Sequence, residues 1–328
     1  MSILNVTSLG TYLNNINTMQ AEQTELQQIS YQVDNGTKAP DLKSYGNQAG
    51  QLLSLKTQLT DEQNYVTNNN VVNTSLAAQS TALSQLSTDA KTLQGALSAI
   101  NGNSSTVNVA TLQSVVNGLL TEIPATLNSQ TGNQYIFGGT RYSTAPVANL
   151  SQVAAPTTPS AFTAATNPTL PSYDSQAPGS SAASYAQQTA QLSSTSTLSY
   201  GVSSNDPAIQ KLVYALQQAQ GASNSTGATQ QQFIQNAIGA LSDTDTSAGA
   251  ITGLSGLSDL ISQKQVTVAS STALHTAVKN TLQTQVDNIQ NVDSATAATE
   301  LSTLQNQLNA SYKVTSTMLN LSILDYLK

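Results

Sequence analysis

The sequence predicts a mainly α-helical fold. It combines long antiparallel coiled-coil helices from both termini with a helical core and a small β-rich or irregular outer insertion. Two observations predict this fold class. Apolar residues near both ends of the 328-residue chain recur every three or four positions, which is the spacing of one helix face. The composition changes near residue 143, where Ala, Ser, Thr, Gln and Pro become frequent.

The C-terminal stripe is the longest helical pattern in the chain. No Pro or Gly follows Thr281, so we expect one uninterrupted rod roughly 50–70 Å long. A helix with one apolar stripe needs a partner that buries it. The stripe consists of Val286, Ile289, Leu301, Leu304, Leu308, Tyr312, Thr315, Leu319 and Ile323.

The start of the chain offers a candidate partner. Its stripe has one gap, at Gln23, and the helix is expected to end near Asn35-Gly36, a pair suited to a left-handed C-cap. Two interpretations are open: the two ends pair as one coiled coil, or they are ordinary members of a helical bundle. The N-terminal stripe consists of Leu9, Leu13, Ile16, Met19, Leu26, Ile29 and Val33.

Two further helices are expected before the change of composition. The first runs from about Leu42 to Ile100, with Asp41 as a possible cap. The second spans Val107 to Asn128, and Pro124 is expected to kink or split it. The stripe of the longer helix consists of Leu52, Leu55, Leu59, Val66, Leu76, Leu83, Leu86, Ala90, Leu93, Leu97 and Ile100.

The remaining elements are shorter. Tyr135-Ile-Phe favours a strand that ends at Gly138-Gly139, and Thr197–Val202 favours another. Asp206-Pro207 is expected to open a helix, with Pro at its first position. Further helices are expected over Gln230–Leu241 and from near Leu257 towards the terminal rod.

These elements predict three domains. Residues 1–40 with 286–328 form the terminal coiled coil, residues 41–142 with 199–285 form the helical core domain, and residues 143–198 form a variable outer domain. The outer segment is either a small irregular β-rich insertion or a flexible segment.

The composition excludes several classes of protein. Charged residues are only 8 % of the chain, the net charge is −7, and Arg141 is the only arginine. Nucleic-acid binding needs clustered cations, which the chain lacks. No apolar run approaches the roughly 18–20 residues of a membrane span, so membrane insertion is not expected. The first positive side chain is Lys38, so we expect either a cytoplasmic protein or one exported without a cleavable signal.

The sequence also predicts no catalytic, cofactor-binding or metal-binding residue. There is no cysteine, which excludes thiolate catalysis and Cys-ligated metals. The glycines at Gly138-Gly139 lack the lysine and the spacing of a phosphate-binding loop. His275 is the single histidine, and we interpret it as a packed or surface side chain. The protein is therefore not expected to be an enzyme or to need a cofactor.

Four segments carry a family resemblance. The first is Gln28–Lys38, where Ser30 and Gly36 take the places of a conserved N-terminal pattern. The second is Tyr135–Thr140, with Tyr135, Phe137, Gly138, Gly139 and Thr140. The third is Ser199–Val202, with Tyr200 and Gly201, followed by Asp206-Pro207, and the fourth is Ser322–Leu327. Together and in this order they resemble the flagellin family of bacterial flagellar axial proteins, which includes filament flagellin and the hook–filament junction protein, hook-associated protein 3.

The resemblance implies a structural subunit of the bacterial flagellum, either a hook–filament junction protein or a short filament flagellin. Its partners would be other copies of itself, neighbouring hook-associated proteins or flagellin, the flagellar export apparatus and an export chaperone. It would be secreted to the flagellum without a cleavable signal. The alternative is a secreted coiled-coil adhesin or effector. The resemblance places the assembly interface on Leu9, Leu13, Ile16, Leu26, Ile29, Leu301, Leu304, Leu308, Tyr312, Leu319 and Ile323.

Overall fold

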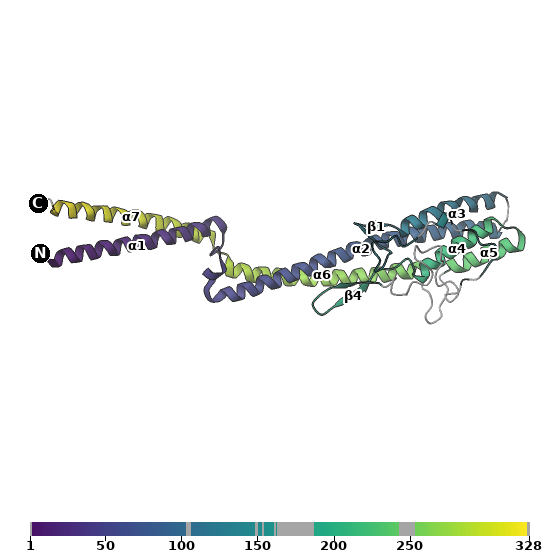
Figure 1. The fold of residues 1–328 in the computed structure, drawn as a ribbon, viewed down its shortest axis with the longest axis horizontal. Helices are drawn as coiled ribbons and strands as arrows, with labels where there is room; N and C mark the ends of the chain where they lie inside the picture. The colour runs from purple at the N-terminus through teal and green to yellow at the C-terminus, as the bar shows by residue number, and fades with distance from the viewer. Residues whose placement is uncertain are drawn as a thin grey trace. The chain divides into compact units, whose positions relative to one another are not determined.

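A computed structural model describes residues 2–102, 106–147, 150–152, 154–160, 162, 187–242 and 253–326. Within these residues the fold consists of seven α-helices and two small antiparallel hairpins, which confirms the predicted mainly α-helical class (Figure 1). The helices are α1 (Ser2–Asn35), α2 (Ala49–Gly102), α3 (Thr106–Leu127), α4 (Pro207–Ser223), α5 (Gly227–Leu241), α6 (Leu254–Gln290) and α7 (Ser294–Tyr326). The strands are β1 (Gln130–Thr131), β2 (Gln134–Tyr135), β3 (Gln188–Gln191) and β4 (Thr197–Tyr200).

The chain divides into two compact units, Met1–Gln63 with Thr276–Lys328 and Asn64–His275. The three-domain division drawn from the sequence stays a prediction. Most of its outer segment, 143–198, lies outside the described residues.

In the first unit, the two ends of the chain lie side by side. Helices α1 and α7 pack antiparallel: the contact residue on α7 changes from Thr315 to Ser311 as the residue on α1 changes from Met19 to Glu22. Figure 1 shows both termini at the same end of this pair. Because the two helices are more than 250 residues apart in sequence, this pairing is a long-range contact.

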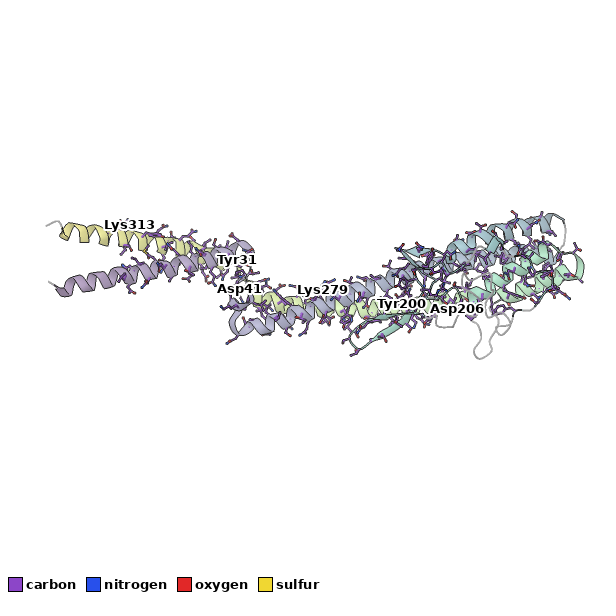
Figure 2. The ribbon with its side chains drawn as sticks, in the orientation of Figure 1. Tyr31, Asp41, Tyr200, Asp206, Lys279 and Lys313 are labelled. Atoms are coloured by element: carbon purple, nitrogen blue, oxygen red, sulfur yellow. The ribbon has the colours of Figure 1, made fainter. Side chains whose placement is uncertain are left out.

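The same unit holds a second helix pair, in which the start of α2 packs against the end of α6. Lys279 Nζ on α6 donates to Gln63 Oε1 on α2 at 2.7 Å (Figure 2). The side chains between the helices form a small apolar core, because the stripes of both helices face each other. This core consists of Leu52, Leu55, Leu282, Val286 and Ile289, with Tyr45 and Leu59 packed against it.

The expected uninterrupted C-terminal rod is wrong, since the helix breaks between α6 and α7. This break lies beside the turn that follows α1. Lys38 N donates to Gln290 O at 2.8 Å, and Val292 N donates to Gly36 O at 3.0 Å. Lys38 Nζ also donates to the carbonyl of Ile289 at 2.8 Å. A cation is favourable at that position, because the last carbonyls of a helix carry partial negative charge. The break is therefore stabilised by a segment distant in sequence.

The second predicted helix also begins later than expected. Residues Leu42–Gln48 form a 3₁₀ segment, and α2 starts only at Ala49. Gly46 has φ 54° and ψ −125°, a conformation that cannot continue a helix. Asp41 caps the 3₁₀ segment by accepting from Ser44 N at 2.9 Å, and this hydrogen bond lowers the pKa of Asp41 (Figure 2).

The second unit contains the main core, which gathers side chains from α2, α3, α4, α5 and the start of α6. Phe137 and Phe233 are fully buried within it. Helices α4 and α5 pack closely, and a Cβ added at Gly221 would lie 2.6 Å from the ring of Phe233. Asp206 caps α4 by accepting from Ala208 N at 3.0 Å, which confirms the helix start predicted from the sequence.

Two details of the second unit correct the sequence-based expectations. Helix α3 is not split at Pro124, since it continues to Leu127 and Asn128 N donates to Pro124 O at 2.9 Å. The strand predicted over Tyr135-Ile-Phe corresponds to β2, which already ends at Tyr135. It pairs with β1 across the two-residue turn that follows Thr131. Ile136 and Phe137 are buried in the core, and Ile136 N still donates to Ser129 O at 3.1 Å.

Candidate assembly interface

The candidate site is the surface formed by α1 and α7. On α1, Ile29 is buried and Ile16 and Leu26 are half-buried. On α7, Leu304 and Leu308 are buried and Leu301 is half-buried. These side chains face each other because both helices carry their apolar residues at three- and four-residue spacing, and the helices run antiparallel. The structure therefore brings most of the described part of the two predicted stripes together.

Polar side chains complete the contact where the stripes are interrupted. Gln23 Nε2 donates to Tyr312 Oη at 2.6 Å, and Ser311 Oγ donates to Glu22 Oε1 at 3.4 Å. Glu22 is only 7 % exposed, and among the described residues its other oxygen, Oε2, has no hydrogen-bond partner. A buried carboxylate oxygen without a donor is unfavourable. The gap in the N-terminal stripe therefore marks a polar section of the helix pair.

The stripe is not fully covered in the single chain. Leu13 is 53 % exposed, and Tyr312 is 43 % exposed although its hydroxyl group is bonded. The side chains of Leu9, Leu319 and Ile323 lie outside the described ones. The role of these residues in assembly stays a prediction.

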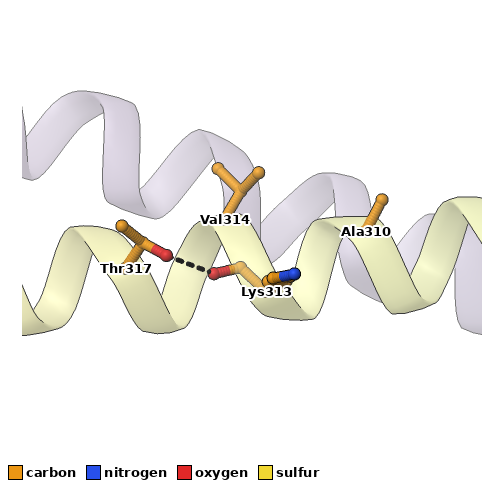
Figure 3. Close-up of a pocket in the computed structure, with 4 residues that line it drawn as sticks. All are labelled: Ala310, Lys313, Val314 and Thr317. Atoms are coloured by element: carbon orange, nitrogen blue, oxygen red, sulfur yellow. Dashed lines mark hydrogen bonds between the residues drawn. The ribbon is translucent and has the colours of Figure 1, made fainter.

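A second face of α7 is also exposed. Ala310, Lys313, Val314 and Thr317 line a groove of about 420 Å³ along this helix (Figure 3). Their spacing of three, four and seven residues places them on one face. This face is separate from the face with Leu304 and Leu308: at about 100° per residue, Lys313 and Thr317 lie on the far side of the helix and Val314 lies on its flank. We refer to the four residues as the outer face of α7.

The family-motif residues lie at two different places. Ser30 and Gly36 are half-buried near the end of α1, in the first unit. The others belong to the second unit, where Phe137, Gly138, Gly139 and Gly201 are buried, Tyr135 and Tyr200 are half-buried, and Thr140 is exposed. The structure does not gather these residues into one pocket.

One residue that the sequence did not single out joins the two motif segments of the second unit. Gln79, on α2, is 3 % exposed and donates through Nε2 to the carbonyls of Ile136 and Val202, the latter at 3.3 Å. Its Oε1 accepts from Val202 N at 3.0 Å. Gly201 has φ +83°, and a Cβ there would lie 3.1 Å from Gln79 Nε2. The sequence signal that could have indicated this role is a glutamine at an apolar-stripe position of the long helix, between Leu76 and Leu83.

The described residues contain no group of three or more His, Asp or Glu side chains that could hold a metal ion. His275 is buried on α6, and its ring lies 4.9 Å from the ring of Tyr65, measured between centroids. It occupies a position where residues seven apart on the same helix, Val268 and Leu282, are apolar and buried. The side chain is thus part of the helix packing.

A buried carboxyl lies between α2 and α3. Gln85 Nε2 donates to Asp89 Oδ1 at 2.9 Å and to Glu122 Oε1 at 3.0 Å. Burial raises the pKa of Asp89, and the nearby charge of Glu122 raises it further. The hydrogen bond from Gln85 lowers it.

Of the helices that the structure describes, none is both long enough and apolar enough to cross a membrane.

Comparisons with known proteins show a shared fold. No known family model matches the sequence, and no curated protein matches it. Among solved structures, the chain is similar to a protein from Vibrio parahaemolyticus described as a flagellar hook-associated protein. The two share 15 % sequence identity with a TM-score of 0.56, and the match covers 76 % of this chain and 100 % of that one. At this identity the similarity establishes the fold alone.

Proposed function

We propose that this chain is a structural subunit of the bacterial flagellum, an axial protein that acts as a hook–filament junction protein or as a short filament flagellin. The observation that carries the proposal is the antiparallel pairing of the two chain ends, α1 with α7. The similarity in fold to a flagellar hook-associated protein supports it. In this role the subunit is non-enzymatic.

The low charge of the chain supports side-by-side packing of copies. The ten Lys and Arg and seventeen Asp and Glu of the 328-residue chain create little long-range repulsion between subunits. The proposed partners are other copies of the chain, neighbouring hook-associated proteins or flagellin, the flagellar export apparatus and an export chaperone. The proposed location is the flagellum outside the cell, reached without a cleavable signal peptide.

Electron microscopy of the purified full-length protein tests the proposal, with and without short filament seeds and isolated hooks. Filaments that grow from this protein alone would identify a filament flagellin. Monomers that bind hook ends in a short ring would identify a junction protein. A protein that does neither would contradict the axial role.

Two deletion variants sharpen this test. Deleting residues 1–35, which removes α1, should abolish assembly, because α7 loses its partner. Replacing residues 163–186 by a short Gly-Ser linker should leave assembly intact. This deletion spares Val147, Leu150 and Leu192 of the outer segment, which are buried in the core. A secreted adhesin or effector would show the reverse pattern, with function lost only in the second variant.

A further inference from the structure

We infer that the outer face of α7 is a docking surface for helix α1 of a second copy, with Lys313 of one copy paired to Glu25 of the other. This inference rests on the proposed function and specifies which surfaces meet between copies. It concerns a face that is distinct from the α1–α7 contact inside one chain.

The first step of the argument is that α7 has two faces suited to packing. Leu304 and Leu308 are buried against α1. On a separate face, Val314 is 52 % exposed and lines the groove with Ala310 and Thr317. The sequence continues this spacing with Leu321 and Leu324. A helix with apolar residues on two separate faces needs two partners, and among the described residues the extensive packing of α7 is with α1.

The second step is that the outer face can lose water without leaving a polar group unpaired. Thr317 Oγ1 donates to the carbonyl of Lys313 at 2.9 Å, so its hydroxyl is already satisfied (Figure 3). The methyl groups of Ala310, Val314 and Thr317 are then available for contact. Small and β-branched side chains allow two helix backbones to approach closely.

The third step identifies the occupant by charge. Lys313 is exposed and is the only charged residue of the outer face (Figure 2). Helix α1 carries Glu22, Glu25 and Asp34 and no lysine or arginine. A second α7 would instead bring another Lys313 to the same surface. Opposite charges across an interface favour the correct partner, and like charges disfavour the wrong one.

Helix α1 also offers a matching face. Thr18, Ala21 and Glu25 follow each other at three- and four-residue spacing, and all three are exposed. The hydroxyl of Thr18 donates to the carbonyl of Asn14 at 2.9 Å, just as the hydroxyl of Thr317 on α7 donates to the carbonyl of Lys313. Both faces therefore combine small apolar groups with one charged side chain, and the charges are complementary.

The absence of native cysteine allows a direct test in the assembled protein. Two single-cysteine variants, Glu25→Cys and Lys313→Cys, are mixed in equal amounts, assembled as filaments or on hook ends, and oxidised. A disulfide forms only where the two Cα atoms come within about 7 Å, so only docked copies give a crosslinked dimer. Ser316→Cys replaces Lys313→Cys as the control, because Ser316 is exposed on the same helix but on another face.

A dimer in the mixture of Glu25→Cys with Lys313→Cys, stronger than in the mixture with Ser316→Cys, is the expected result. Assembled material without this dimer, together with no rescue in the charge-reversal double variant described below, would overturn the inference and leave the proposed function standing. A dimer from Lys313→Cys alone would show that α7 docks on α7 and would also overturn it. If the wild-type protein fails to assemble at all, the proposed function fails and the inference falls with it.

Charge reversal gives an independent measurement. In wild-type background, Lys313→Glu or Glu25→Lys should each raise the protein concentration needed for assembly by about fivefold. The double variant should restore it to near the wild-type value, because the pair is re-formed with its signs exchanged. Single effects without rescue in the double variant would contradict a direct pairing.

Discussion

Replacing Gln79 by leucine tests how the two segments that contain Ile136 and Val202 are held on α2. The substitution keeps the size of the side chain and removes its three hydrogen bonds, to the carbonyls of Ile136 and Val202 and from the amide of Val202. Leaving each of these buried groups unpaired costs about 1–3 kcal/mol. Burying the leucine side chain returns about 1.5–3 kcal/mol. With three groups unpaired, the central values of these ranges differ by about 4 kcal/mol, so we expect the free energy of unfolding to fall by roughly that amount.

The measurement is urea unfolding followed by circular dichroism, together with hydrogen exchange at the Val202 amide. The matched control is Gln94→Leu, the same substitution at an exposed position of the same helix, which should change stability by less than about 0.5 kcal/mol. Exchange at Val202 should become more than about tenfold faster in Gln79→Leu, since about 1.4 kcal/mol corresponds to a factor of ten. If both variants unfold alike and Val202 stays protected, Gln79 does not hold these segments.

Three further predictions concern packing, pH and the helix break. In thermal unfolding, Gly221→Ala should lower stability by about 1–3 kcal/mol, because the added Cβ would collide with Phe233. The control Gly239→Ala should be neutral or stabilising, because a Cβ added there meets no atom within 4 Å. Because the pKa of Asp89 is raised in the folded protein, its contribution to stability is present below about pH 4 and is lost as the pH rises. Asp89→Asn should therefore be more stable than wild type at pH 7 but not at pH 3, in urea unfolding at the two pH values. Lys38→Met should speed hydrogen exchange at residues 290–292, because the helix end loses its cation, and unchanged exchange would count against that role.

Part of the candidate site follows from the sequence alone. The stripes on both terminal segments predicted two helices and the apolar face of each, and Ile29, Leu304 and Leu308 are buried as that periodicity requires. From the residue pattern, the pairing of these two faces with each other was one of two open interpretations. The polar section at Glu22 and Gln23 was visible only as a gap in the stripe. Its hydrogen bonds to Ser311 and Tyr312 could not be predicted, because they depend on the register between helices distant in sequence.

The start of α4 shows what local sequence determines. Asp206-Pro207 predicted the beginning of this helix, because the cap and the fixed φ of proline act within one turn. Helices α3 and α5, and α2 apart from its start, follow in the same way from the spacing of their apolar residues. These signals act over a few residues, so the amino-acid sequence by itself determines them.

Tertiary structure decided where the long helices break and what lies between them. Asn291–Asp293 contains no Pro or Gly, and the segment after α1 supplies hydrogen bonds to both sides of the break. Asp293 adds a local signal, because it caps α7 by accepting from Ala295 N at 2.9 Å. The role of Gln79 likewise exists only when two distant segments arrive at α2. At the break, the hydrogen bonds from the segment after α1 add to a weak local preference against continuing the helix. At Gln79, leaving buried polar groups unpaired would be costly, so contacts between distant segments determine the outcome.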